Sequence, residues 1–216
     1  MKDYTKAILL DLINRMPDLK FCRDNILLAV QCIIHCYREG NKLLTCGNGG
    51  SASDAQHIVG ELMKSFVLTR VLPLSKQKEI RECFPNSADY LIENLQVALP
   101  AISLIGETAL TTAYANDVTS DLSFAQQVLG YGSRGDILIA FSTSGNSNNV
   151  LYASQVAKVQ GMTVIAFTGE KGGKLRELAD IIIDVPSDET YRIQEYHLPI
   201  YHALCMAVEY EFFGEE

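Results

Sequence analysis

One stretch of the sequence, residues 45–62, contains residue types that could act on a small anionic molecule. Three glycines follow a short apolar segment: Gly47, Gly49 and Gly50. Glycine allows a sharp turn and lets a ligand approach the main chain. His57 and Glu61 come next, four residues apart, and therefore share one face of the predicted helix. The stretch predicts a strand, a turn and a helix with a histidine and a glutamate on one face.

Three interpretations of this stretch compete. The pattern Gly47-x-Gly49-x-x-Ala52 resembles a dinucleotide fingerprint, which also needs an acidic residue about 20 residues later. Residues 63–77 contain no acidic residue, which disfavours a dinucleotide. The second interpretation is a tight turn with a His/Glu pair on the surface. The third is a sugar-phosphate site with a base and a metal ligand on the helix. In this site Ser51 or Ser53 caps the helix, whose free N–H groups attract phosphate.

A second polar turn lies at residues 142–147, between an apolar segment and a predicted helix. Gly145 allows it to curve tightly, and it carries four hydroxyl groups: Ser142, Thr143, Ser144 and Ser147. A helix cap needs only one of these hydroxyls. Hydroxyls, backbone N–H groups and a helix start together favour a phosphate site.

The predicted last helix, residues 190–213, carries His197 and His202. A single histidine in a helix is usually structural. Gln194 lies eight residues before His202, about 12 Å along a regular helix. For both to serve one site, either the helix deforms at Pro199 or the site contains residues of more than one subunit.

Apolar segments alternate with helical ones along the chain, which predicts an α/β fold. Five segments read as buried strands: residues 42–46, 101–105, 137–141, 162–167 and 181–185. Helices are expected at 107–115, 120–130 and 148–160, with Asn116 and Asp117 in a turn. The pattern predicts a three-layer, doubly wound parallel sheet of about five strands. The turns at 47–53 and 142–147 both fall at carboxyl ends of strands, where such sheets bind ligands.

We expect a single domain, 1–216, that begins with N-terminal helices in residues 1–40, at 4–16 and 23–39. Residues 65–101 are the least regular part, with prolines at three positions and helical spacing only within 87–99. We interpret this segment as an excursion from the sheet, either a lid or an interface segment.

Composition narrows the classes of partner. The chain has 216 residues, 48% of them hydrophobic, and a net charge of −8, which argues against nucleic acid and anionic membranes. The six cysteines show no CxxC pattern and most lie in apolar segments, which favours small buried thiols in a reducing compartment over zinc sites or disulfides. The start of the chain does not resemble a signal peptide and no apolar run approaches 18 residues, so we expect a cytoplasmic protein.

Four motifs in this order resemble the sedoheptulose-7-phosphate isomerase (phosphoheptose isomerase) family of the sugar isomerase (SIS) superfamily. They are Gly47-Asn-Gly-Gly-Ser51, His57-x3-Glu61, Ser142-Thr-Ser-Gly-Asn-Ser147, and Thr190-x-Arg-Ile-Gln-Glu195 with His202. The resemblance covers the chain from about residue 20 to the end. It implies a flavodoxin-like SIS fold and a homotetramer with active sites at subunit interfaces. It also implies conversion of sedoheptulose 7-phosphate to D-glycero-D-manno-heptose 7-phosphate in heptose biosynthesis.

The resemblance also implies residue roles. Glu61 matches the catalytic base and His202 the partner acid/base. Zinc is bound in some members at the positions of His57, Glu61, Gln194 and His202. Substrate-binding positions match Asn48, Gly49, Ser51, Asp117, Ser142, Thr143, Ser144, Ser147 and Gln194.

Two features differ from the best-known members of the family: segment 65–101 is longer, and Lys64-Ser65 stands where they have an arginine. An isomerase of another sugar phosphate is one alternative. A non-catalytic SIS adaptor, which senses sugar phosphates or binds protein, is the other. Such adaptors lack the glutamate and the late histidine, so Glu61 and His202 favour an enzyme.

Overall fold

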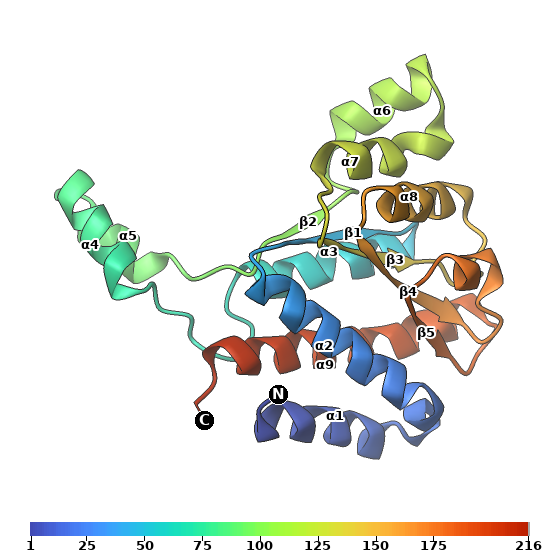
Figure 1. The fold of residues 1–216 in the computed structure, drawn as a ribbon, viewed down its shortest axis with the longest axis horizontal. Helices are drawn as coiled ribbons and strands as arrows, with labels where there is room; N and C mark the ends of the chain where they lie inside the picture. The colour runs from blue at the N-terminus through green and yellow to red at the C-terminus, as the bar shows by residue number, and fades with distance from the viewer. Residues whose placement is uncertain (216) are drawn as a thin grey trace.

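The computed structural model describes residues 1–215. Its sheet has five parallel strands in the order β2-β1-β3-β4-β5 (Figure 1). They are β1 (Leu43–Cys46), β2 (Ala101–Ser103), β3 (Ile137–Phe141), β4 (Thr163–Gly169) and β5 (Ile181–Val185). The chain moves from β1 to one side and then returns to the other side at β3. The loops after β1 and β3 therefore lie at a topological switch point, where open α/β sheets bind ligands.

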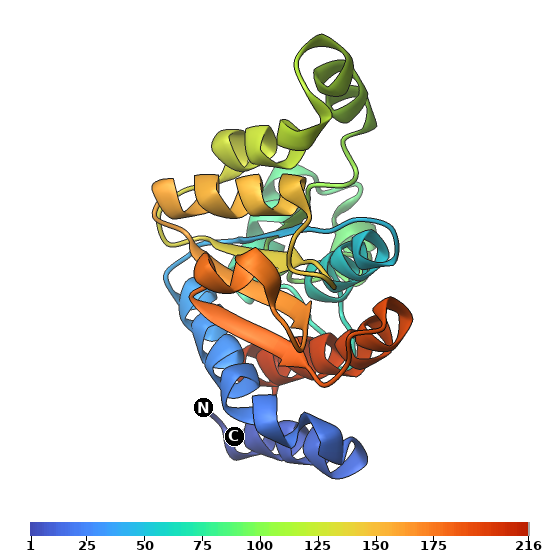
Figure 2. The ribbon, with the colours of Figure 1, turned by 90° about the vertical axis from the view of Figure 1, so that its right-hand side faces the viewer.

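Helices cover both faces of the sheet, which gives the three predicted layers (Figures 1 and 2). Alternate strand residues, among them Leu43, Ile139 and Phe167, pack against α2 (Arg23–Arg38), α3 (Gly50–Met63) and α9 (Thr190–Phe213). The residues between them, such as Leu44 and Leu138, face α7 (Ser123–Tyr131) and α8 (Asn148–Val159). Nearly every position of the three central strands is buried, as expected of a parallel sheet between two helical layers.

The N-terminal helices lie on the α9 side of the molecule. Helix α1 (Asp3–Arg15) packs on α9, and the 3-10 helix η1 (Pro17–Cys22) leads into α2. Both helices predicted for residues 1–40 are present. The Thr5 hydroxyl is buried and lies 3.3 Å from the carboxylate of Glu211 on α9, which fixes α1 against the last helix.

The segment predicted to be irregular contains two short helices that project from the body (Figure 1). These are α4 (Leu74–Cys83) and α5 (Ala88–Asn94), which pack on each other. The sequence pattern missed α4 because the helix buries no side chain and so shows no apolar stripe. It begins after Pro73, ends before Pro85, and carries ion pairs along its surface, such as Lys76 with Glu79.

A second deviation concerns the segment that follows β2. Helix α6 extends over Thr108–Asp117, so Asn116 and Asp117 form its last turn and do not follow it as predicted. A 3-10 turn, η2 (Ser120–Leu122), then precedes α7, and another, η3 (Gly173–Glu177), follows β4. Within residues 1–215, no helix is both long enough and apolar enough to cross a membrane.

Candidate active site

The glycine turn after β1 is built by close backbone contacts. A Cβ atom on Gly47 would lie 2.5 Å from the carbonyl oxygen of Ser51, and Gly49 has a φ of +57°. A Cβ atom on Gly50 would lie 2.6 Å from Nε2 of Gln194 on α9. Ser51 is buried in the first turn of α3, whose N-cap is Gly49 and which no side chain caps. The first N–H groups of α3 therefore have no capping hydroxyl, as an anion site requires.

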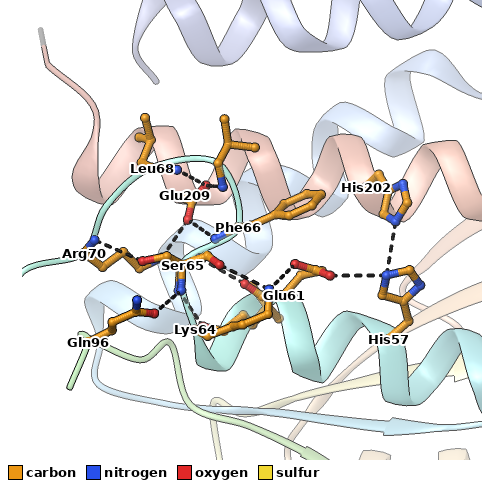
Figure 3. A network of polar contacts seen from close by, with 12 residues as sticks. His57, Glu61, Lys64, Ser65, Phe66, Leu68, Arg70, Gln96, His202 and Glu209 are labelled. Carbon is orange, nitrogen blue, oxygen red and sulfur yellow. Dashed lines mark hydrogen bonds and ion pairs between the residues drawn. The ribbon is translucent and has the colours of Figure 1, made fainter. Parts of the chain in front are cut away.

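Helices α3 and α9 bring His57, Glu61 and His202 together (Figure 3). Nε2 of His57 lies 3.2 Å from Oε1 of Glu61 and 3.5 Å from Nε2 of His202. The other carboxylate oxygen of Glu61 lies 2.9 Å from Nζ of Lys64. The carboxylate of Glu61 and the imidazole of His202 thus converge on the same nitrogen, Nε2 of His57, within one chain.

The residues of this cluster differ in burial, and burial shifts the pKa of His202. The side chain of Glu61 is 12% exposed, whereas that of His57 is 42% exposed. Partial burial lowers the pKa of His202, the neighbouring His57 lowers it further, and Glu61 acts in the opposite direction. The lowered pKa favours the neutral imidazole of His202, which can accept a proton. A largely buried carboxylate beside an imidazole is suited to general acid/base chemistry.

Two residues that the sequence analysis did not select lie behind the cluster. The hydroxyl of Tyr201 is 3.0 Å from Nδ1 of His57 and donates a hydrogen bond to Oδ1 of Asp54 at 3.2 Å. Burial raises the pKa of Asp54, against the hydrogen bond from Tyr201 and the charge of His57. The signal in the sequence is periodic, because Asp54 precedes His57 by three residues and Glu61 by seven, on one helix face.

A buried ion pair holds the end of α3 beside Glu61 (Figure 3). Nε of Arg70 lies 2.8 Å from Oε1 of Glu209, and both side chains are fully buried. The guanidinium also donates to the carbonyl oxygens of Leu62 at 2.6 Å and Glu61 at 3.0 Å. Glu209 accepts further hydrogen bonds from the backbone N–H groups of Phe66, Val67 and Leu68. The pair thus satisfies the last carbonyls of α3 and anchors the loop that leaves it.

The serine turn after β3 uses its hydroxyls within the loop and not as a helix cap. Oγ of Ser142 donates to Oγ of Ser147 at 3.1 Å, and α8 has no side-chain cap. Oγ of Ser144 accepts a hydrogen bond from the backbone N–H of Asn146. The turn is tight, because a Cβ on Gly145 would lie 1.9 Å from the carbonyl oxygen of Gly172. The hydroxyl-rich turn and the start of α8 together have the features of a phosphate cradle.

Hydrogen bonds link the glycine turn to the start of α8, whereas two of the predicted site residues lie away from the His57 cluster. The side chains of Asn48 and Asn149 exchange hydrogen bonds of 2.9 Å, which joins the glycine turn to the start of α8. Gln194 lies against Gly50, which precedes His57 by about two turns of α3. Asp117 ends α6, is exposed, and accepts a hydrogen bond from its neighbour Asn116. In this single chain, neither Gln194 nor Asp117 contacts the His57 cluster.

The donor atoms of the cluster suit zinc in kind. Two imidazole nitrogens and a carboxylate oxygen are common zinc ligands, and tetrahedral ligand atoms lie roughly 3.3 Å apart. The distances from Nε2 of His57 to Glu61 and to His202 are close to this value. The described residues nevertheless contain no group of three or more His, Cys, Asp or Glu side chains arranged to hold a metal ion. Of the four expected ligands, His57, Glu61 and His202 lie near each other, whereas Gln194 lies apart from them.

The fold and this arrangement define a sugar isomerase (SIS) domain. The SIS domain family matches residues 11–77 and 79–169. Phosphoheptose isomerase from Burkholderia pseudomallei (strain 1710b) is 40% identical over 178 residues, which cover 82% of this chain and 77% of that protein. Phosphoheptose isomerase from Shewanella sp. (strain W3-18-1) is 39% identical over 196 residues, which cover 89% and 86%.

Solved structures agree. Phosphoheptose isomerase from Neisseria gonorrhoeae superposes with a TM-score of 0.73 at 31% identity, covering 96% of this chain and 97% of that one. The enzyme from Francisella tularensis gives a TM-score of 0.71 at 32% identity, covering 95% and 93%. The chain belongs to the phosphoheptose isomerase family of SIS domain enzymes. The family resemblance and the predicted fold class are confirmed.

Proposed function

We propose that this enzyme converts sedoheptulose 7-phosphate to D-glycero-D-manno-heptose 7-phosphate, as part of heptose biosynthesis. The observation that carries the proposal is the convergence of Glu61 and His202 around His57, in a chain that matches phosphoheptose isomerases over most of its length. The reaction moves hydrogen between adjacent carbons and needs no external oxidant or reductant.

Glu61 is the proposed base. Its carboxylate removes a proton from C1 of the ketose, which gives an enediol(ate), and the proton returns at C2 to give the aldose. His202 moves a proton between the two oxygens, from O1 to O2. Each of these roles contributes roughly 10²–10⁴ in rate. Lys64, 2.9 Å from Glu61, provides a positive charge near the developing oxyanion.

The phosphate group of the substrate is proposed to lie in the serine turn, held by Ser142, Thr143, Ser144 and Ser147. The uncapped start of α8 supports this placement. Asn48, Gly49 and Ser51 line the sugar from the glycine turn, which the hydrogen bonds between Asn48 and Asn149 hold next to α8. Asp117 and Gln194 complete the proposed sugar site.

Zinc is the proposed cofactor, held by His57, Glu61, His202 and Gln194. The donor types and the two short separations support the first three ligands. Bound zinc supplies a Lewis acid that stabilises oxyanion charge. Because Gln194 lies at Gly50 in its own chain, a fourth ligand from this position requires either a rearrangement of α9 or a second subunit.

A homotetramer with active sites at subunit interfaces is also proposed. Large apolar side chains exposed on the N-terminal elements support an interface there: Tyr4, Leu10, Phe21 and Leu28. Light scattering on the purified protein tests the subunit number. Location in the cytoplasm, and the expectation of neither nucleic acid nor a membrane as a partner, stay predictions.

Incubation with sedoheptulose 7-phosphate, followed by NMR detection of the aldose, tests the proposed reaction. We expect turnover by the purified enzyme and its loss in Glu61→Gln, because the amide cannot accept the proton. Unphosphorylated sedoheptulose is the control for the phosphate site. If the enzyme converts only a different sugar phosphate, the proposed substrate is wrong. If Glu61→Gln keeps full activity, Glu61 is not the base. Binding without turnover would favour the adaptor alternative.

A further inference from the structure

Asn149 is a residue outside the predicted site that joins its two turns. The side-chain amides of Asn149 and Asn48, 101 residues apart, donate to each other's oxygen, and both hydrogen bonds are 2.9 Å long. Asn48 belongs to the glycine turn after β1, and Asn149 to the first turn of α8, directly after the serine turn. The pair therefore spans the topological switch point of the sheet, between the proposed sugar site and the proposed phosphate site.

A third hydrogen bond fixes the orientation of this pair. The backbone N–H of Val150 lies 3.0 Å from Oδ1 of Asn149, and only the oxygen of a side-chain amide can accept a hydrogen. Nδ2 of Asn149 then faces Asn48, whose oxygen must lie opposite it. If the Asn48 amide alone were turned over, two oxygens would meet and two NH₂ groups would meet. The start of α8 thus determines which way the Asn48 amide points.

The pair contributes little to the stability of the fold. Asn48 is exposed and Asn149 is half-buried, so water can replace either hydrogen bond at a small net cost. The pair does restrict Asn48, because an exposed side chain without a partner samples several rotamers, and a bound ligand must then order it. Each amide has two N–H groups and the pair uses one of each, so a second N–H group of Asn48 remains for a ligand.

We propose that Asn149 is a positioning residue that acts through Asn48: it holds the Asn48 amide in one orientation, so that the second N–H group is ordered before the sugar binds. This role rests on the proposed function, in which Asn48 lines the sugar. The reciprocal hydrogen bonds also hold the glycine turn at a fixed separation from the start of α8, and thereby the sugar relative to its phosphate group. The role of Asn149 is therefore in substrate binding and not in folding.

Asn149→Ala removes the partner and keeps the Asn48 side chain. We expect KM for sedoheptulose 7-phosphate to rise roughly 2–10-fold, the range that the ordering of one side chain gives. We expect kcat to stay within about twofold of wild type, because a contact to the unreacting part of the sugar acts on ground state and transition state alike. The thermal unfolding midpoint is expected to be that of wild type.

Asn148→Ala is the matched control, since Asn148 is the adjacent residue, of the same type and exposed on the same turn of α8. We expect it to keep the KM of wild type. An equal rise of KM in Asn148→Ala, or a rise in Asn149→Ala that accompanies a lower unfolding midpoint, would overturn the positioning role. An unchanged KM in Asn149→Ala would do the same.

The variant Asn48→Ala and the double variant Asn48→Ala/Asn149→Ala show whether Asn149 acts through Asn48. We expect the double variant to have the KM of Asn48→Ala alone, because Asn149 then has no amide left to orient. Increases of KM that multiply in the double variant would show that Asn149 acts independently of Asn48, against the proposal.

A measurement without turnover separates this inference from the proposed function. In ¹H–¹⁵N spectra of the full chain, the side-chain NH₂ signals of Asn48 are assigned by their loss in Asn48→Ala. We expect them to move in Asn149→Ala and to keep their positions in Asn148→Ala. Signals that do not move in Asn149→Ala would contradict the pairing. The expected movement in a protein that does not isomerise sedoheptulose 7-phosphate would support the orientation of Asn48 and count against the proposed reaction only.

Discussion

The four histidines of the chain occupy three environments. His35 is exposed, His197 is fully buried between the rings of Phe141 and Phe167, and His57 with His202 lies at the active site. His197 and His202 are five residues apart on one helix, and sequence spacing alone did not distinguish their roles. Burial does distinguish them, because an imidazole without contact to solvent or substrate cannot exchange protons in a reaction.

His197 is predicted to make stability depend on pH. Burial lowers its pKa to about 4 from the ordinary 6.5, so between these values the unfolded chain binds more protons than the folded protein. The contribution of the neutral, buried His197 to stability is therefore fully present above pH 6.5 and is lost as the pH falls toward 4. We expect His197→Gln to remove roughly 2–3 kcal/mol of the decrease between pH 7.5 and 4.5, at about 1.4 kcal/mol for each pKa unit.

Urea unfolding of wild type and His197→Gln at several pH values measures this difference. Carboxylates also titrate in this range, but their contribution is shared by both proteins and cancels in the comparison. Parallel curves of unfolding free energy against pH would show that His197 is not the titrating group.

At the scale of elements, the pairing of α3 with α9 builds the active site. Contacts follow both helices in the same direction, from Gly50 with Gln194 to His57 with His202. Further along, Glu209 on α9 pairs with Arg70, which lies in the loop after α3. The Arg70 guanidinium donates to the last carbonyls of α3, including that of Glu61. The orientation of the proposed base thus depends on a buried charge pair outside the reacting groups.

Glu209→Gln is predicted to lower the free energy of unfolding by roughly 3–5 kcal/mol, because it leaves the Arg70 guanidinium buried without its counter-charge. It replaces one acceptor oxygen with a donor, opposite backbone N–H groups that also donate. We expect kcat to decrease as well, since the end of α3 loses its anchor. Glu195→Gln, an exposed position on the same helix, is the matched control. Equal unfolding midpoints for both variants in urea would contradict the proposed anchor.

The way in which an element is stabilised decides whether the sequence could predict it. The five strands and the helices against the sheet were predicted because burial forces apolar periodicity on them. Helix α4 has no buried side chain and was missed. Within the site, the sequence analysis selected His57, Glu61 and the serine turn on their residue types. Arg70, Tyr201 and Glu209 were not selected, because their roles arise only when α9 lies beside α3.

At the scale of the whole molecule, the chain divides into a body and an arm. The arm, residues 72–95, contains α4 and α5, which pack on each other and bury only Ala88. Its two ends meet at an isolated antiparallel bridge between Val71 and Gln96. Large apolar side chains are exposed on it, among them Leu74, Phe84 and Tyr90. The body therefore gains little of its stability from the arm.

Replacement of residues 72–95 by about four glycine and serine residues is predicted to leave the body folded. Arg70 and Gln96 remain, so the contacts of the α3 end and of Ser65 with Gln96 are kept. A shorter loop between ends that already meet changes the closure entropy by only about 1–2 kcal/mol. We expect a thermal unfolding midpoint within a few degrees of wild type, as measured by circular dichroism. Loss of cooperative unfolding would show instead that the arm belongs to the folding unit. A body that stays folded but decreases in subunit number, as measured by light scattering, would identify the exposed apolar arm as the contact between copies.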